Sequence, residues 1–141
     1  MYKLSQLAKD GKIMFNGNEV ADTILYVNGD YVRKSEAVIS VYDSGFQHGD
    51  GVYEGIRTYG RKVYRLEEHL KRLYESCYSL GIEVGKTKEE MIEIVKELIR
   101  RNIDAGFHDL HMRLQVTRGF KVQTGMHPTL NITSSSIVIC V

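Results

Sequence analysis

The sequence predicts an α+β domain in which a mostly antiparallel sheet packs against two helices. Residues alternate with a period of two at 53–59 and at 110–117, and apolar residues recur at three- and four-residue steps between residues 66 and 99. The predicted elements follow one another as strands, then helices, then strands, and this order is typical of α+β domains. The chain has 141 residues, of which 43% are hydrophobic, and this is enough to bury one core.

Turn residues divide the first half into short strands. Residues 24–32 carry Asn28-Gly29-Asp30 at their centre, which predicts a β-hairpin. Further strands are predicted at residues 37–42 and 52–59, and a short return strand is predicted at residues 62–64.

The hydrophobic period changes to that of a helix at Leu66, and the first helix is expected to end at Gly81. The second helix is expected to begin at Thr87, because Glu90 follows three residues later in the pattern of a capping box. Gly106 follows the end of this helix.

A strand is predicted again at residues 110–117, followed by a polar loop at 119–135 and a strand at 136–141. Alternation within the first of these strands predicts one apolar and one polar face. The apolar face would carry Leu110, Met112, Leu114 and Val116, and the polar face His111, Arg113, Gln115 and Thr117.

Composition excludes several classes of function. A net charge of +1 gives no reason to expect nucleic acid or an anionic membrane as a partner. The sequence shows no apolar run long enough to span a bilayer and no signal-peptide h-region at its N-terminus, so we expect neither a membrane span nor a secretory signal. Cys77 and Cys140 lie far apart without metal-ligand spacing, so we expect reduced thiols, no metal and a cytoplasmic protein.

The stretch from Tyr42 to Tyr59 concentrates the chemistry. Its alternation places Tyr53, Gly55, Arg57 and Tyr59 on one face of a strand. Tyrosine and arginine around a glycine without a side chain would leave room for a small anionic ligand. The alternative is an ordinary hairpin with a solvated arginine.

Three motifs occur in order: DSGFQHGDGVYEGIR at 43–57, EHLKRL at 68–73 and RLQVTRG at 113–119. Together they resemble the N-terminal half of the class IV aminotransferases, the fold type IV enzymes that use pyridoxal 5'-phosphate. That family includes branched-chain aminotransferases, D-amino-acid transaminases and aminodeoxychorismate lyase. The resemblance implies this cofactor, amino-acid and 2-oxo-acid substrates, and a homodimer.

The resemblance runs from about Ile24 to the end of the chain. It implies an N-terminal extension at residues 1–23 and, at 24–141, the N-terminal domain of such an enzyme. The family's Schiff-base lysine belongs to a C-terminal domain, and no lysine of this chain lies in the corresponding context. We therefore expect no catalytic residue here and no transaminase activity from this chain alone.

The motif at 68–73 assigns one residue to the cofactor. Arg72 matches the family's arginine for the cofactor phosphate, and a guanidinium offers a fixed fork of donors to phosphate oxygens. The alternative is a solvated arginine paired along the helix with Glu68 or Glu75. His69, in the same motif, is expected to be structural.

Five residues are expected on the substrate side. Tyr53 matches a pocket aromatic residue, and Arg57 and Arg113 match arginines of branched-chain enzymes, with Arg113 directed at the substrate carboxylate. His48 and His111 stand where branched-chain enzymes carry tyrosines. A lone histidine is as readily a structural hydrogen-bonding residue.

The resemblance favours transfer of an amino group between a branched-chain L-amino acid and 2-oxoglutarate. D-amino-acid transaminases place an arginine and a histidine in the loop where this chain has Gln123 and Gly125. A substrate carboxylate without those partners would be costly to bury. The alternatives are a D-amino-acid or (R)-amine transaminase, aminodeoxychorismate lyase, or a non-catalytic binding module with this fold.

Overall fold

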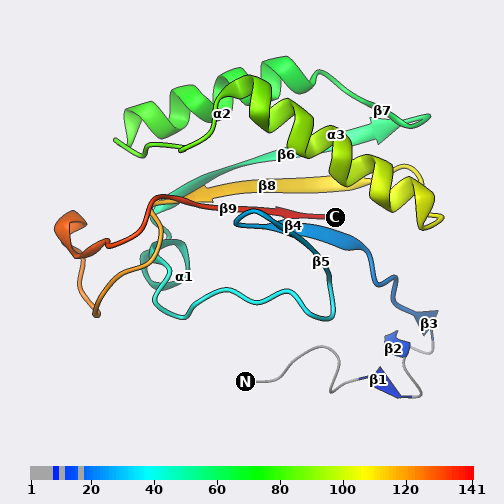
Figure 1. The fold of residues 1–141 in the computed structure, drawn as a ribbon, viewed down its shortest axis with the longest axis horizontal. Coiled ribbons are helices and arrows are strands. Elements are labelled where there is room, and N and C mark those ends of the chain that lie inside the picture. The colour runs from blue at the N-terminus through cyan, green and yellow to red at the C-terminus, as the bar shows by residue number, and fades with distance from the viewer. Residues whose placement is uncertain (1–7, 10–11, 16–17) are drawn as a thin grey trace.

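The computed structural model describes residues 8–9, 12–15 and 18–141, and it confirms the α+β class. A six-stranded antiparallel sheet is covered on one face by two long helices (Figure 1). The strands lie in the order β5-β4-β9-β8-β6-β7. Their bounds are Ile24–Val27 (β4), Asp30–Arg33 (β5), Gly51–Tyr59 (β6), Lys62–Val63 (β7), His111–Thr117 (β8) and Ser136–Cys140 (β9).

Before the main sheet, three short strands pair in the order β1-β2-β3. They are Ala8–Lys9, Lys12–Phe15 and Asn18–Glu19. The proposed extension at 1–23 also contains residues 1–7, 10–11 and 16–17, which lie outside the described residues. The main sheet begins at Ile24 with the predicted hairpin, in which Asn28 and Gly29 have φ values of 50° and 113°.

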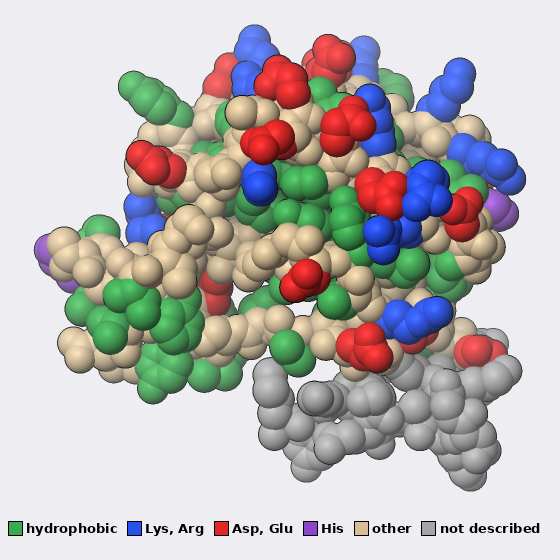
Figure 2. Space-filling view, in the orientation of Figure 1, with side chains coloured by type: hydrophobic (Ala, Val, Ile, Leu, Met, Phe, Trp, Pro, Cys, Tyr) green, Lys and Arg blue, Asp and Glu red, His purple; other side chains and the backbone are tan. Residues whose placement is uncertain are grey.

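Both predicted long helices are present, as α2 (Leu66–Ser79) and α3 (Lys88–Asp104). The capping box is confirmed, because the Thr87 hydroxyl accepts from the Glu90 amide at 3.1 Å and the Glu90 carboxylate accepts from the Thr87 amide at 2.7 Å. The outer face of α3 carries interleaved charges, which Figure 2 shows as neighbouring red and blue side chains.

The core fills the space between the helices and the upper face of the sheet. The predicted alternation is confirmed in β8, where Met112, Leu114 and Val116 are fully buried. Thr117 differs from the prediction, since it is buried and donates a hydrogen bond to Asp43. The other core side chains include Ile56, Leu70, Leu73, Cys77, Met91, Val95, Leu98, Ile137 and Ile139.

The strand predicted at residues 37–42 is wrong. This segment runs under the sheet to a short helix, and Val38, Ile39 and Val41 are exposed (Figure 1). Its ends are fixed by turn hydrogen bonds, Ala37 N to Arg33 O and Asp43 N to Ser40 O. β-Branched residues favour a strand only where a partner strand is available, and within the described residues β5 pairs with β4 alone.

Asn102 joins α3 to the sheet beside the end of β9. Its amide Nδ2 donates to the carbonyls of Ile24 and Leu98, at 2.9 and 3.0 Å, and its Oδ1 accepts from the Ile24 amide at 2.9 Å. The side chain is fully buried. Asn102 therefore satisfies backbone groups at the start of β4.

Replacing Asn102 with alanine is expected to lower the free energy of unfolding by about 2–4 kcal/mol, because two backbone groups of Ile24 lose their partner in a buried place. Urea unfolding followed by circular dichroism measures the loss. Arg100→Ala on the exposed face of α3 is the control. A loss at position 102 no larger than that of the control would contradict this role.

Candidate functional site

Strand β6 separates two sets of side chains by its pleat. Glu54, Ile56 and Thr58 are buried beneath the helices. The alternate residues are exposed on the lower face, which confirms that Tyr53, Gly55, Arg57 and Tyr59 share one face of the strand.

The register with β8 adds two predicted site residues to this lower face. Gly55 lies opposite Arg113, and Arg57 lies opposite His111. The Thr58 amide donates to the Leu110 carbonyl, so the pairs formed by Gly55 and Arg57 are the non-hydrogen-bonded type, whose side chains lie closest. The structure thus brings together Tyr53, Arg57, His111 and Arg113.

Arg113 is stacked on Tyr53, with its guanidinium carbon 3.7 Å from the ring centre. Its Nε donates to Gln115 Oε1 at 3.2 Å. A stacked guanidinium keeps its remaining N–H groups in the plane of the group, where they can bind a carboxylate. Gly55 has no side chain between these residues, and a Cβ there would make only an ordinary contact with His111 Nε2 at 3.7 Å. The lower face can therefore bind a small anion.

An apolar cavity of about 370 Å³ lies on the same face of the sheet. Gln115, which holds Arg113, is part of its lining. The cavity is bounded on its other side by the segment from Ala37 to Phe46. An arginine cluster beside an apolar cavity suits a ligand with a carboxylate and a small hydrocarbon group.

Arg72 lies on the opposite face, where it forms an ion pair that joins α2 to β6. Its Nε and Nη2 donate to the two carboxylate oxygens of Glu54, each at 2.5 Å. His69 Nδ1 lies 2.9 Å from the same carboxylate. The partner of Arg72 is therefore neither Glu68 nor Glu75, and His69 has the structural contact expected of it.

This ion pair is buried on one side only. The Glu54 side chain is 8% exposed, whereas that of Arg72 is 65% exposed. The hydrogen bonds from Arg72 hold the pKa of Glu54 below its usual value against the opposing effect of burial, and His69 lowers it further. The exposed guanidinium, fixed from below by a carboxylate, fits a second anion such as a phosphate.

One edge of this stretch of β6 is open. Residues Gly51 to Arg57 pair with β8 on one side. On the other side β7 pairs with Thr58 and Tyr59, and the Tyr64 amide after it donates to the Arg57 carbonyl. In the described part of the chain, no strand pairs with β6 there between Gly51 and Ile56. Glu54 stands between Tyr53 and Gly55, so the Arg72 site and the lower-face cluster flank the same open edge.

His48 lies at the end of a short helix, α1 (Ser44–His48), that the sequence analysis did not predict. The turn residues expected there form its two ends, with Asp43 as N-cap and Gly49 as a left-handed C-cap. His48 Nε2 is 3.0 Å from the Gly125 carbonyl, which also accepts from Lys121 Nζ. His48 thus contacts the loop after β8 and is not brought into the arginine cluster.

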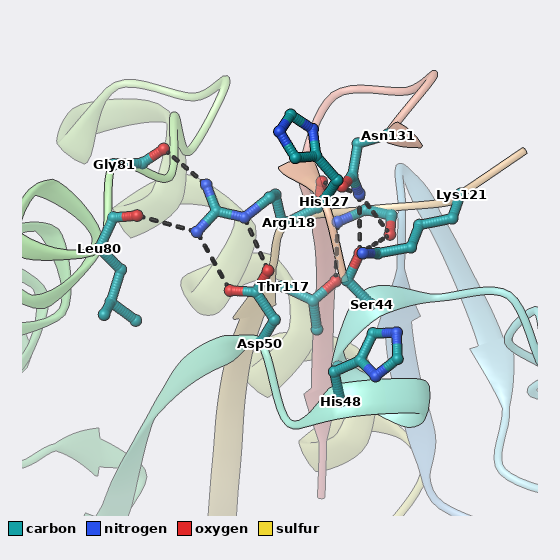
Figure 3. A network of polar contacts seen from close by, with 12 residues as sticks. Ser44, His48, Asp50, Leu80, Gly81, Thr117, Arg118, Lys121, His127 and Asn131 are labelled. Carbon is teal, nitrogen blue, oxygen red and sulfur yellow. Dashed lines mark hydrogen bonds and ion pairs between the residues drawn. The ribbon is translucent and has the colours of Figure 1, made fainter. Parts of the chain in front are cut away.

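Arg118 ties this loop to the start of β6 and the end of α2 (Figure 3). It donates to both oxygens of Asp50, at 2.7 and 3.1 Å. It also donates to the carbonyls of Leu80 and Gly81, at 2.8 and 2.9 Å. Sequence reasoning missed Asp50, Arg118 and Glu54. A signal existed for Glu54, because a carboxylate at an inward strand position requires a buried partner.

Comparison with known proteins supports the motif analysis. The model of the class IV aminotransferase family matches residues 51–139. A Methanocaldococcus jannaschii protein, provisionally named a branched-chain-amino-acid aminotransferase, is 48% identical to this chain. The match covers 67% of this chain and 32% of the relative. A D-alanine aminotransferase of Staphylococcus epidermidis is 34% identical over 76% of this chain and 37% of its own length.

The solved structures that resemble this chain include branched-chain aminotransferases. A T.th. branched-chain amino acid aminotransferase with pyridoxamine 5'-phosphate has a TM-score of 0.73 and 31% identity, over 85% of this chain and 40% of that one. The same enzyme complexed with N-(5'-phosphopyridoxyl)-L-glutamate has a TM-score of 0.72. This chain spans between about a fifth and a little over a third of the length of the curated relatives it matches, from 21% to 37%.

The lowered pKa of Glu54 predicts a pH dependence of stability. A carboxylate whose pKa is lowered by folding stabilises the protein above the unfolded value, near 4.5, and this contribution is lost as the pH falls through the folded value. The stability difference between the wild type and Glu54→Gln should therefore shrink from pH 6 to pH 3. Urea unfolding at several pH values measures it, with the exposed Glu67→Gln as control. A difference that is constant with pH would contradict the ion pair.

Proposed function

Because the chain belongs to the class IV aminotransferase family, we propose that it forms the N-terminal part of a pyridoxal-phosphate-dependent aminotransferase. The observation that carries this proposal is the arrangement of arginines around the open edge of β6. Arg72 lies on one face, held by a buried carboxylate, and Arg57 and Arg113 lie on the other. Such a site binds two anions, a phosphate and a carboxylate.

Each residue has a separate part in this proposal. Arg72 binds the cofactor phosphate through the guanidinium edge that Glu54 leaves free. Arg113 orients the substrate carboxylate, and Tyr53 supports its guanidinium from below by stacking. Arg57 and His111 line the same face. We place His48 at the rim, where it holds the loop at Gly125.

The cofactor, when bound, supplies the electron sink that stabilises negative charge at the substrate Cα. We propose that the lysine that holds it belongs to the further length present in the relatives, so that this chain alone has no transaminase activity. We also propose a homodimer in the cytoplasm. The free thiols of Cys77 and Cys140 agree with a reducing compartment. In the described residues, no helix is long and apolar enough to cross a membrane.

For the substrate we propose a branched-chain L-amino acid, with 2-oxoglutarate as amino acceptor. The apolar cavity beside Gln115 and Arg113 supports a small hydrocarbon side chain, and the M. jannaschii relative supports the same class. The second candidate is a D-amino acid, since the S. epidermidis relative is named for D-alanine. Transfer from an (R)-amine, an aminodeoxychorismate lyase reaction and a non-catalytic binding module are the further hypotheses.

The full-length protein is expected to transfer amino groups from L-leucine and L-valine to 2-oxoglutarate faster than from D-alanine or an (R)-amine. Glutamate formation in a coupled assay measures the four rates. Faster turnover of D-alanine or the amine would overturn the substrate assignment and leave the family unchanged. Absence of transfer from all four, with cofactor bound, would favour the lyase reaction or the non-catalytic module.

Arg72→Ala in the full-length protein is expected to weaken the binding of pyridoxal 5'-phosphate on the order of ten- to a hundredfold, because a charge-assisted contact to phosphate is lost. Cofactor absorbance after dilution and dialysis measures its retention. Lys71→Ala is a matched control, since Lys71 is the preceding residue of α2 and its side chain is 70% exposed. Equal cofactor retention in the two variants would show that Arg72 does not bind the phosphate.

A further inference from the structure

We propose that Glu54 is a positioning residue for the cofactor phosphate, which it serves by fixing the orientation of the Arg72 guanidinium. This proposal rests on the proposed function, and specifically on phosphate binding by Arg72. Glu54 touches neither cofactor nor substrate in it. Its part is to select which edge of the guanidinium faces the ligand.

The geometry of the pair selects that edge. Glu54 accepts one hydrogen bond on each carboxylate oxygen, from Nε and from Nη2 of Arg72. These two nitrogens form the side edge of the guanidinium, and both are engaged. Three N–H groups remain, two on Nη1 and one on Nη2. One Nη1–H and the remaining Nη2–H form the end edge, which matches a second anion with two oxygens.

His69 fixes the carboxylate in turn. Its Nδ1 lies 2.9 Å from Glu54 Oε2 and 3.3 Å from Arg72 Nη2. Nη2 can only donate, so the closer contact to the carboxylate assigns the proton to Nδ1, which donates to Glu54. The Glu54 carboxylate therefore has three donors, all from one face of α2. It cannot rotate without losing at least one of them.

Burial separates this pair from the ordinary surface pairs of the protein. The Arg100–Glu97 pair on α3 joins side chains that are 60% and 32% exposed and lies within one helix. Glu54 is 8% exposed and comes from a strand that pairs with β8 along seven residues, so its carboxylate has a fixed position. A rigid carboxylate restrains the long, otherwise flexible arginine side chain, which reduces the entropy lost when the ligand binds.

The test measures selectivity for the phosphate group in the full-length protein. The probes are pyridoxal 5'-phosphate and pyridoxal, which differ only by the phosphate, and the readout is the factor by which the phosphate tightens binding. Glu54→Gln is expected to lower this factor about tenfold while the affinity for pyridoxal changes less than about twofold. Glu97→Gln, which removes a half-buried ion-pair partner on α3, is the control and should leave the factor unchanged.

A double variant shows whether Glu54 acts through Arg72. In the Arg72→Ala background, Glu54→Gln should lower the factor no further, because the residue that it orients is gone. If Glu54→Gln does not fold, Glu54→Asp serves in its place. The aspartate keeps the negative charge but is one methylene shorter, so it should also lower the factor by which the phosphate tightens binding.

The outcomes separate this inference from the proposed function. If Arg72→Ala keeps the wild-type factor, the phosphate assignment itself is wrong. If Arg72→Ala lowers the factor and neither Glu54 variant does, only the positioning role is overturned. A Glu54 variant that weakens both probes equally would show that the pair stabilises the fold without positioning the arginine.

Discussion

The pleat of β6 is the constraint on which the remaining structure depends. Successive side chains must point to opposite faces, so one strand supplies both the floor of the helix layer and the exposed cluster beneath it. Glu54 and Ile56 face α2, while Tyr53 and Arg57 face away. A slip of one residue against β8 would bury the arginine and expose the core, so the packing of α2 and the position of the site are fixed together.

A second set of contacts carries this register into the loops. Thr117 donates to Asp43, and Ser44 donates to the Gly119 carbonyl, so α1 is joined to the end of β8. Arg118 then connects Asp50, at the start of β6, to the Leu80 and Gly81 carbonyls at the end of α2. Several of these hydrogen bonds are buried or charge-assisted. Loss of one partner would leave the other polar group buried without a hydrogen bond, which costs free energy of folding, so the contacts form together. The loop that contacts His48 therefore has its position fixed by the sheet.

Local patterns predicted the elements whose signal lies within one segment. Alternation in β8 and the capping box at Thr87 depend on neighbouring residues, and both predictions are confirmed. The strand predicted at 37–42 was wrong because strand formation needs a distant partner. Likewise, the helix motif identified Arg72, but its partner Glu54 lies 18 residues away and is set by the packing of α2 on β6. The roles given to the site residues remain predictions from resemblance.

The open edge of β6 has a consequence for handling the protein at high concentration. The Thr58 amide points to β8, so by alternation the backbone groups of Tyr53 and Gly55 point outward, where no strand of the described chain pairs with them. Unpaired edge groups are a template for another β-strand. Strand addition between copies of this chain is therefore sterically open at this edge, and a ligand or protein segment seated there would block it.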